Sequence, residues 1–149
     1  MNKSLLIIFL FLMLTSCNEK ITNDIVISTK VELNTAIKNA KPGDVIILKD
    51  GTYSNLEILF VGEGTKKKPI TLRAETPGKV FIEGISNLEI SGNFLNVEGL
   101  FFRNGHSPTA NVIAFRTSKE SVANNSSVSN CVILDFNNLE RDQENLWVQ

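Results

Sequence analysis

Few residues of this 149-residue chain have the types and spacing that catalysis or ligand binding requires. His106, the only histidine, lies in the predicted loop Asn104-Gly105-His106-Ser107-Pro108, and Arg116 ends an apolar run. Either side chain could contact a substrate, so both are candidate substrate-binding residues. The alternatives are a solvated His106 and an Arg116 that pairs with a local carboxylate. The chain has no Cys-x-x-Cys, His-Glu-x-x-His, Gly-x-Ser-x-Gly or phosphate-cradling motif.

The acidic residues are scattered and show no shared spacing that would build a metal site; they include Glu57, Glu63, Glu83, Glu89 and Glu98. The sequence therefore predicts no catalytic residue and no metal ligand within this chain. Cys131 lies in an apolar run, which favours a buried thiol that packs as a small hydrophobic side chain.

The first residues predict an export signal. Lys3 supplies a positive charge, and Leu5–Leu14 is an apolar run too short to span a bilayer comfortably. Leu14-Thr15-Ser16-Cys17 is similar to the bacterial lipobox, in which the cysteine is lipidated and becomes the new N-terminus. The prediction is a signal peptide over 1–16, lipidated Cys17 with a polar tether over 17–24, and one domain over 25–149. An ordinary signal peptide with an incidental Cys17 is the alternative.

This division predicts an exported bacterial lipoprotein at the outer membrane, facing the periplasm or the cell surface. Its partner there would be the membrane, through the lipid at Cys17. Because Cys131 would then be the only free thiol, no intramolecular disulfide could form. The net charge of −1 for the whole chain becomes −2 without Lys3. That balance argues against a nucleic-acid partner, which would normally meet a basic face, but it allows an acidic substrate.

One helix is predicted after a short strand at 24–28. Thr29 and Glu32 have the spacing of a capping box, and Pro42-Gly43 marks the end of the helix. The apolar residues between these signals recur at helical spacing: Leu33, Ala36, Ile37 and Ala40.

Beyond the helix the hydrophobic period changes to two. Strands are predicted at 45–48, 52–61, 70–74, 80–83, 88–91, 94–97, 100–102, 112–116 and 128–136. Val45 and Ile70 are 25 residues apart, Ile70 and Phe94 are 24 apart, and Leu100 and Val132 are 32 apart. Such offsets are typical of the coils of a solenoid. Residues 62–68, which include three lysines, are predicted to be a solvated surface loop rather than a ligand site.

These features predict an all-β fold, a right-handed parallel β-helix with a short N-terminal capping helix. Asparagine is frequent in the second half of the chain, and it suits both left-handed corners and stacked hydrogen-bonded ladders. A sandwich or barrel could use the same turns. The helix favours the solenoid, because a solenoid needs an atypical element over its end.

The segment 39–53 resembles the opening of parallel β-helix polysaccharide lyases. Residues 69–75 and 99–105 sharpen this to polysaccharide lyase family six, and 112–119, 130–133, Arg141 and 145–148 continue the resemblance. This stretch is more similar to the alginate lyase branch than to the chondroitinase B branch. The resemblance covers essentially all of 25–149.

The resemblance implies β-elimination on a uronic-acid polymer, with alginate as the expected substrate. In the family, Ca²⁺ neutralises the uronate carboxylate, a lysine removes the C5 proton and an arginine assists the leaving oxygen. The residues that do this are expected beyond Gln149, so the chain is expected to be truncated after the first few coils and inactive alone. The alternatives are a chondroitin or dermatan lyase and a non-catalytic β-helix surface protein that binds glycan or acts as a spacer.

Overall fold

The structure is a computed structural model that describes residues 23–137 and 146–149. Within them the chain forms one helix, α2, and fourteen strands. The predicted signal peptide, Cys17, most of the tether and Arg141 lie outside the described residues. None of the described helices is long and apolar enough to cross a membrane.

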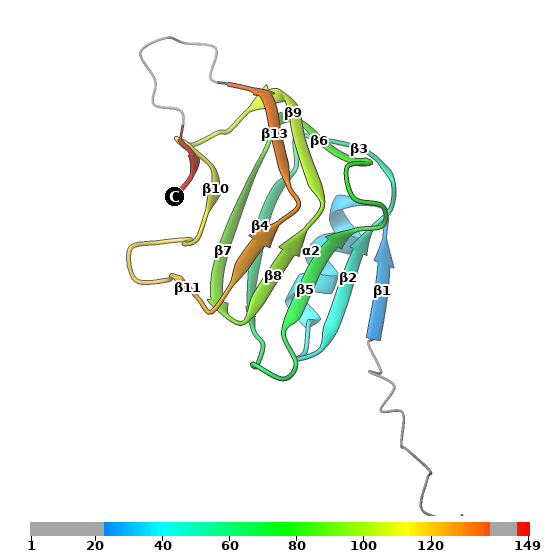
Figure 1. The fold of residues 1–149 in the computed structure, drawn as a ribbon, viewed down its shortest axis with the longest axis vertical. Helices are drawn as coiled ribbons and strands as arrows, with labels where there is room; N and C mark the ends of the chain where they lie inside the picture. Colours follow the sequence, from blue (N-terminus) through cyan, green and yellow to red (C-terminus); the bar gives the residue numbers. More distant parts are fainter. Residues whose placement is uncertain (1–22, 138–145) are drawn as a thin grey trace, which may run out of the picture.

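The strands form three parallel sheets that wind around one core (Figure 1). The first sheet holds β1 (Asn23–Ile27), β2 (Asp44–Leu48), β5 (Ile70–Ala74), β8 (Leu95–Glu98) and β12 (Ser127–Ser129). The second holds β3 (Gly51–Ser54), β6 (Val80–Ile85), β9 (Leu100–His106) and β13 (Val132–Phe136). The third holds β4 (Glu57–Glu63), β7 (Asn87–Asn93), β10 (Asn111–Ala114), β11 (Ala123–Asn124) and β14 (Leu146–Val148). The chain visits the sheets in turn, which confirms the predicted parallel β-helix.

The predicted offsets between coils are each wrong by one residue. Val45 pairs with Thr71 and Ile70 with Leu95. Phe101, and not Leu100, pairs with Val132. Because side chains alternate between the two faces of a strand, a slip of one residue would have stacked buried Leu100 on half-exposed Val132. The observed register instead stacks Ile133 on fully buried Phe102.

Four corners between sheets use a non-glycine residue with positive φ, and three of these are asparagines: Asn55, Phe94, Asn125 and Asn130. Asn104 and Asp135 also have positive φ, but they lie within β9 and β13. The corners break two stretches for which the sequence predicts continuous strands. Asn55 (φ 54°) separates β3 from β4, and Asn130 (φ 52°) separates β12 from β13. Asparagine tolerates this left-handed conformation better than other non-glycine residues do, which fits the predicted role of this residue type.

Stacked asparagines also form the expected ladder along the solenoid. Asn93 donates from Nδ2 to Glu63 Oε2 at 3.3 Å, and Asn125 donates from Nδ2 to Asn93 Oδ1 at 3.4 Å. The three residues lie on successive coils at the corner between the third sheet and the first. This ladder therefore fixes neighbouring coils to one another outside the backbone hydrogen bonds.

Two glycines are required where coils approach most closely. A Cβ at Gly92 would collide with the Gly62 carbonyl oxygen, and one at Gly105 would collide with the Gly84 carbonyl oxygen. Each pair occupies the same position on neighbouring coils, since Gly62 pairs with Gly92 and Gly84 with Gly105. A side chain at either outer position would push the coils apart.

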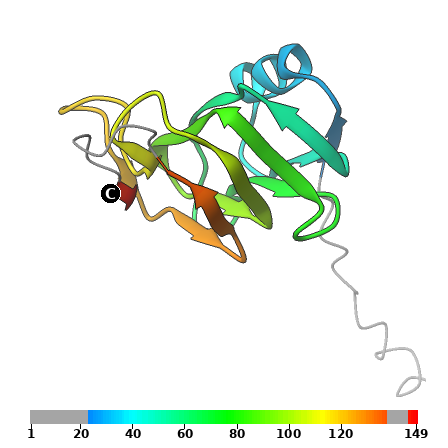
Figure 2. The ribbon, with the colours of Figure 1, turned by 90° about the horizontal axis from the view of Figure 1, so that it is seen from above.

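Helix α2 (Lys30–Asn39) covers one end of the solenoid, opposite the C-terminal end (Figure 2). Thr29 and Glu32 form the predicted capping box, with the Glu32 amide donating to Thr29 Oγ1 at 3.2 Å. Leu33, Ala36 and Ile37 are buried, and Ala40 packs against the same core. The Ser28 and Thr29 donors hold the pKa of the exposed Glu32 carboxyl below its usual value, with the Ser28 backbone amide as the largest cause.

Thr29→Ala is expected to lower the free energy of unfolding by about 1 kcal/mol, because it removes the oxygen that satisfies a first-turn amide. The measurement is urea denaturation followed by circular dichroism. Thr35→Ala is the matched control, since Thr35 is exposed and its hydroxyl bonds only to Val31 O one turn back in the helix. Equal losses in the two variants would contradict this role for the cap.

Candidate functional site

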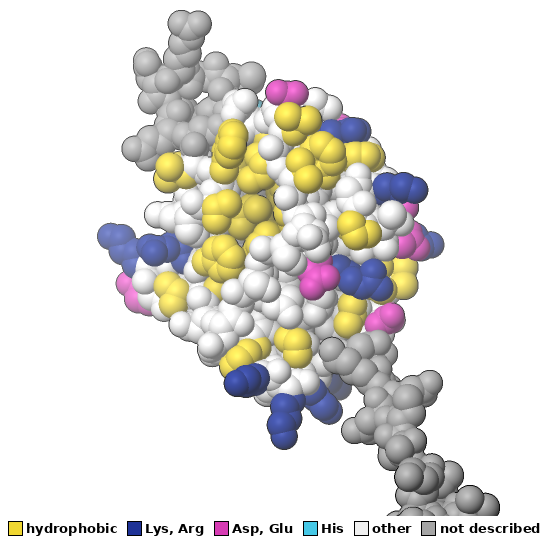
Figure 3. Space-filling model, viewed as in Figure 1, with side chains coloured by type: hydrophobic (Ala, Val, Ile, Leu, Met, Phe, Trp, Pro, Cys, Tyr) yellow, Lys and Arg dark blue, Asp and Glu magenta, His cyan; other side chains and the backbone are white. Residues whose placement is uncertain are grey.

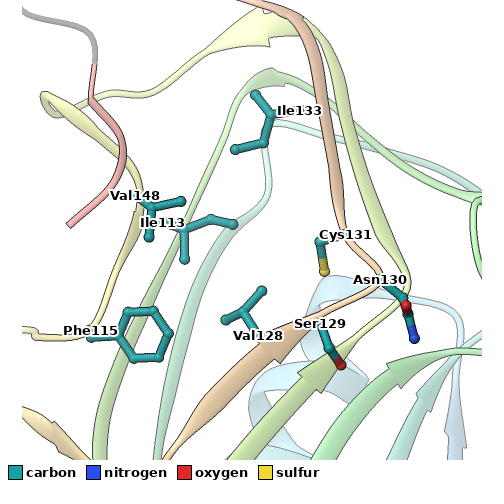
Figure 4. A pocket seen from close by; sticks show the side chains of 8 residues that line it. All are labelled: Ile113, Phe115, Val128, Ser129, Asn130, Cys131, Ile133 and Val148. Carbon is teal, nitrogen blue, oxygen red and sulfur yellow. The ribbon is translucent and has the colours of Figure 1, made fainter.

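The end of the solenoid away from α2 carries an apolar groove. Among the described strands, β12 and β13 are the last members of the first two sheets, so nothing described pairs with their outer edges. A groove of about 250 Å³ opens between them and β14; it is lined by Ile113, Phe115, Val128, Ser129, Asn130, Cys131, Ile133 and Val148. Figure 4 shows Ile113, Val128, Ile133 and Val148 converging on one space. Hydrophobic side chains also gather on this side in the space-filling view (Figure 3).

The groove can bind apolar side chains, and the strand edges beside it can hydrogen-bond to another strand. Val148 is 60% exposed, although its register partner Ile113 is 2% exposed. The groove thus continues the hydrophobic core and would suit a further coil stacked in the same parallel register. The side chains that line it include no carboxylate, imidazole, lysine or arginine, and the Cys131 thiol is the one titratable group among them.

Cys131 lies in this groove, half-buried and packed against the core. Burial raises the pKa of its thiol, while hydrogen bonds from the backbone of Leu100 and Gly99 oppose that rise. The thiol is therefore protonated at neutral pH and is a poor nucleophile. This agrees with the predicted packing role, although Cys131 is less buried than a core residue.

His106 is the last residue of β9, and not a loop residue as predicted. It pairs with Ile85 across the coils, and its carbonyl oxygen accepts from the Ser86 amide at 3.0 Å. The close pairing of Gly84 with Gly105 extends the strand this far. The imidazole is half-buried at the corner that leads to the third sheet.

Arg116 is exposed and lies two residues beyond β10, in a bridge with Val122. It forms no ion pair with any described residue. His106 pairs with Ile85, which precedes β7, whereas Thr117 beside Arg116 bonds to Ser91 near the end of β7. The structure does not bring the two candidates into one site.

The described part of the chain contains one ion pair, on the outer face of the second sheet. Arg103 Nε donates to Glu83 Oε1 at 2.7 Å, and the guanidinium carbon lies 3.5 Å from the centroid of the Phe81 ring. Phe81 in turn contacts Phe101, with ring centroids 5.6 Å apart. Local sequence patterns do not predict this cluster, because its members come from strands about twenty residues apart. The repeated spacing of Phe81 with Glu83 and of Phe101 with Arg103 was the only available signal.

Residues 23–137 and 146–149 contain no group of three His, Cys, Asp or Glu side chains that could hold a metal ion. The calcium that the family resemblance implies therefore finds no fitting site among the described residues. What the described residues do offer is an apolar stacking surface at the end of the solenoid.

The family model described as Chondroitinase B matches residues 26–149. The chain belongs to this family, polysaccharide lyase family six (PL6). The PL6 alginate lyase AlyGC is 47% identical over 84% of this chain, with a TM-score of 0.82. A mannuronic acid specific family 6 lyase from human gut microbiota is 33% identical over 85% of it, with a TM-score of 0.75. A PL6 polysaccharide lyase from Pseudopedobacter saltans is 35% identical over 83% of it, with a TM-score of 0.76.

The matches cover 17% of the AlyGC chain, 30% of the gut lyase and 28% of the Pseudopedobacter saltans lyase. The described PL6 coils thus correspond to a minor part of the length of these relatives. A search of the curated proteins found no match.

Alkylation of Cys131 is expected to be slower than that of a free cysteine at pH 8 and to rise only at higher pH. Labelling is slower because the raised pKa of the thiol leaves less thiolate at a given pH below that pKa. The measurement is iodoacetamide labelling followed by mass spectrometry across pH 7–10 in a Cys17→Ser background. The urea-unfolded chain serves as control, and an equal rate in the folded chain would contradict burial of the thiol.

Proposed function

We propose that these coils belong to a polysaccharide lyase that cleaves alginate by β-elimination. The observation that carries the proposal is the 47% identity to an alginate lyase over 84% of the chain. A second PL6 relative is a mannuronic acid specific lyase, which is consistent with a polyuronate substrate. A chondroitin or dermatan substrate is the second candidate, favoured by the description of the matching family model.

In such a reaction the C5–H of the uronate is removed by a base while the glycosidic oxygen at C4 leaves. The proton is weakly acidic until the neighbouring carboxylate is neutralised, which a hard cation such as Ca²⁺ would do when bound. Because the described residues offer no set of metal ligands, no step involving the ion is assigned to them. Calcium dependence stays a prediction about the whole lyase.

The role that we propose for these coils is to start and align the solenoid. α2 covers the first coil, the paired glycines and asparagine corners set the register, and the groove around Val148 offers an apolar seat for a following coil. The position of every later side chain would then be fixed by the coils before it. Any error in register here would displace a reacting group by one residue and turn it to the opposite face.

A chimera tests this role directly. We expect residues 26–149 to replace the matching coils of AlyGC with alginate lyase activity kept within about tenfold, since the core stacking is shared and one tenfold step equals about 1.4 kcal/mol. Activity is measured as ultraviolet absorbance of the unsaturated uronate product, on alginate and on chondroitin sulfate, with and without a chelator. The 149-residue chain alone should give no product.

Val148→Asp and Leu134→Asp are the matched variants of the chimera. Both side chains are more than half exposed in this chain, but only Val148 lines the groove. Val148→Asp should abolish activity by burying a charge under the next coil, whereas Leu134→Asp should be tolerated. A folded but inactive chimera, or product formed by the chain alone, would contradict the proposal.

We further propose that the protein is an exported lipoprotein attached to the outer membrane through Cys17. The lipobox-like segment 14–17 and the apolar run before it support this. Expression in a Gram-negative host with radiolabelled palmitate should label the chain and place it in the membrane fraction. Cys17→Ser should lose the label and become soluble, whereas Cys131→Ser should not. Label retained in Cys17→Ser would refute the anchor.

A further inference from the structure

Four exposed lysines occupy two turns that lie side by side at one edge of the solenoid. Lys66, Lys67 and Lys68 lie on the turn between β4 and β5, and Lys41 lies on the turn before β2. Gly43 donates from its amide to Pro69 O at 3.2 Å, which ties the two turns together. Lys and Arg side chains gather at the lower tip of the space-filling view, where Figure 1 places the β4–β5 turn. We call these four residues the basic edge.

The turn that carries three of these lysines is held rigidly. Thr65 and Lys68 exchange two backbone hydrogen bonds of 3.0 Å, and Lys68 also donates to Thr65 Oγ1 at 3.1 Å. Gly64 donates to Asn93 O at 2.9 Å and packs so closely that a Cβ there would collide with the Phe94 carbonyl oxygen. The turn therefore presents its ammonium groups from a fixed base, which lowers the entropy lost when a ligand binds.

Little negative charge offsets the basic edge. Asp44 is buried and accepts hydrogen bonds from the Lys41 amide and from Asn23 Nδ2. Glu63 is the one carboxylate at the β4–β5 turn, and it accepts from Asn93. None of the four lysines forms an ion pair with a described residue. Because the whole chain has a net charge of −1, this concentration of positive charge is local.

The surface beside the basic edge carries one carboxylate, Glu63, and is rich in hydrogen-bonding amides. The ladder of Asn93 and Asn125 begins at Glu63 and crosses the later coils along the same corner. Arg116 and Lys119, in the exposed loop between β10 and β11, add cations further along the solenoid. Amides suit sugar hydroxyls and lysines suit carboxylates, so the corner combines the two chemistries of a uronic-acid polymer.

We propose that the basic edge binds the carboxylates of a polyuronate chain. The identity of the polymer rests on the proposed function. Exposed lysine–carboxylate contacts are individually weak, but several contacts on one polymer add together. A local positive field also raises the rate of encounter with a polyanion, an effect that salt screens.

Affinity electrophoresis in native gels containing alginate tests this with the full chain carrying Cys17→Ser. The triple variant Lys66→Gln/Lys67→Gln/Lys68→Gln is expected to bind alginate about tenfold more weakly than its parent at low ionic strength. The control is Lys30→Gln/Lys49→Gln/Lys79→Gln, which removes the same charge from exposed lysines outside the basic edge. The control should remain within about twofold of the parent, and both variants should keep the parent's thermal midpoint.

Two outcomes overturn the proposal: equal weakening in both triple variants, or no weakening in the basic-edge variant. Binding to polyglutamate as tight as to alginate would overturn the saccharide part. A difference that disappears in 0.5 M salt supports the electrostatic origin of the contact. Since no cleavage is required, alginate binding by a chain whose AlyGC chimera is inactive would preserve the basic edge while refuting the lyase role.

Discussion

The parallel register between successive coils is the constraint on which this structure depends. Each inward side chain stacks on the residue at the same position of the coil before it, as Ile46 stacks on Leu72 and Leu72 on Val97. All three are buried, and burying such side chains stabilises the fold by roughly 1.5–3 kcal/mol each. Because successive side chains of a strand point to opposite faces, a slip of one residue at any coil would turn its inward side chains outward. Burial and register therefore enforce one another.

The register also decides which residues the corners can use. A coil that closes on itself must turn three times, and the turns recur at stacked positions where neighbouring backbones nearly touch. Gly84 with Gly105, and Gly62 with Gly92, leave no room for a side chain at the outer member of each pair. Those four glycines lie near the ends of their strands, whereas Asn55 and Asn130 adopt positive φ at the corners themselves. The composition of the chain, rich in asparagine and punctuated by glycine, is thus a consequence of stacking.

Patterns among residues close together in the sequence predict the helix and most strands of this fold. They do not predict the contacts between coils. The capping box of Thr29 and Glu32, the apolar stripe of α2 and strand β5 all follow from residues within a few positions of one another. The corner at Asn130 cannot be placed inside Val128–Phe136 from sequence, because β-propensity runs through it and only the stacking on the previous coil decides. Arg103 and Glu83 meet across a register shift between Ile82 and Gly84. The hydrophobic period of the sequence does not predict that shift. The glycine before His106 suggests a turn, whereas in the structure that glycine is what lets β9 continue.

The parallel register also allows different coils of one chain to have different roles. Each coil contacts only its neighbours, so a solenoid can devote one part of its length to alignment and another to reaction. The described coils have the features of a part devoted to alignment. Helix α2 covers one end, and an apolar groove lies at the other end. Their one ion pair lies against aromatic rings on the exterior. Their outer faces are free to vary so long as the inner rows stay in register. A basic edge can therefore arise on two turns without disturbing the core, because those side chains lie outside every stacked row.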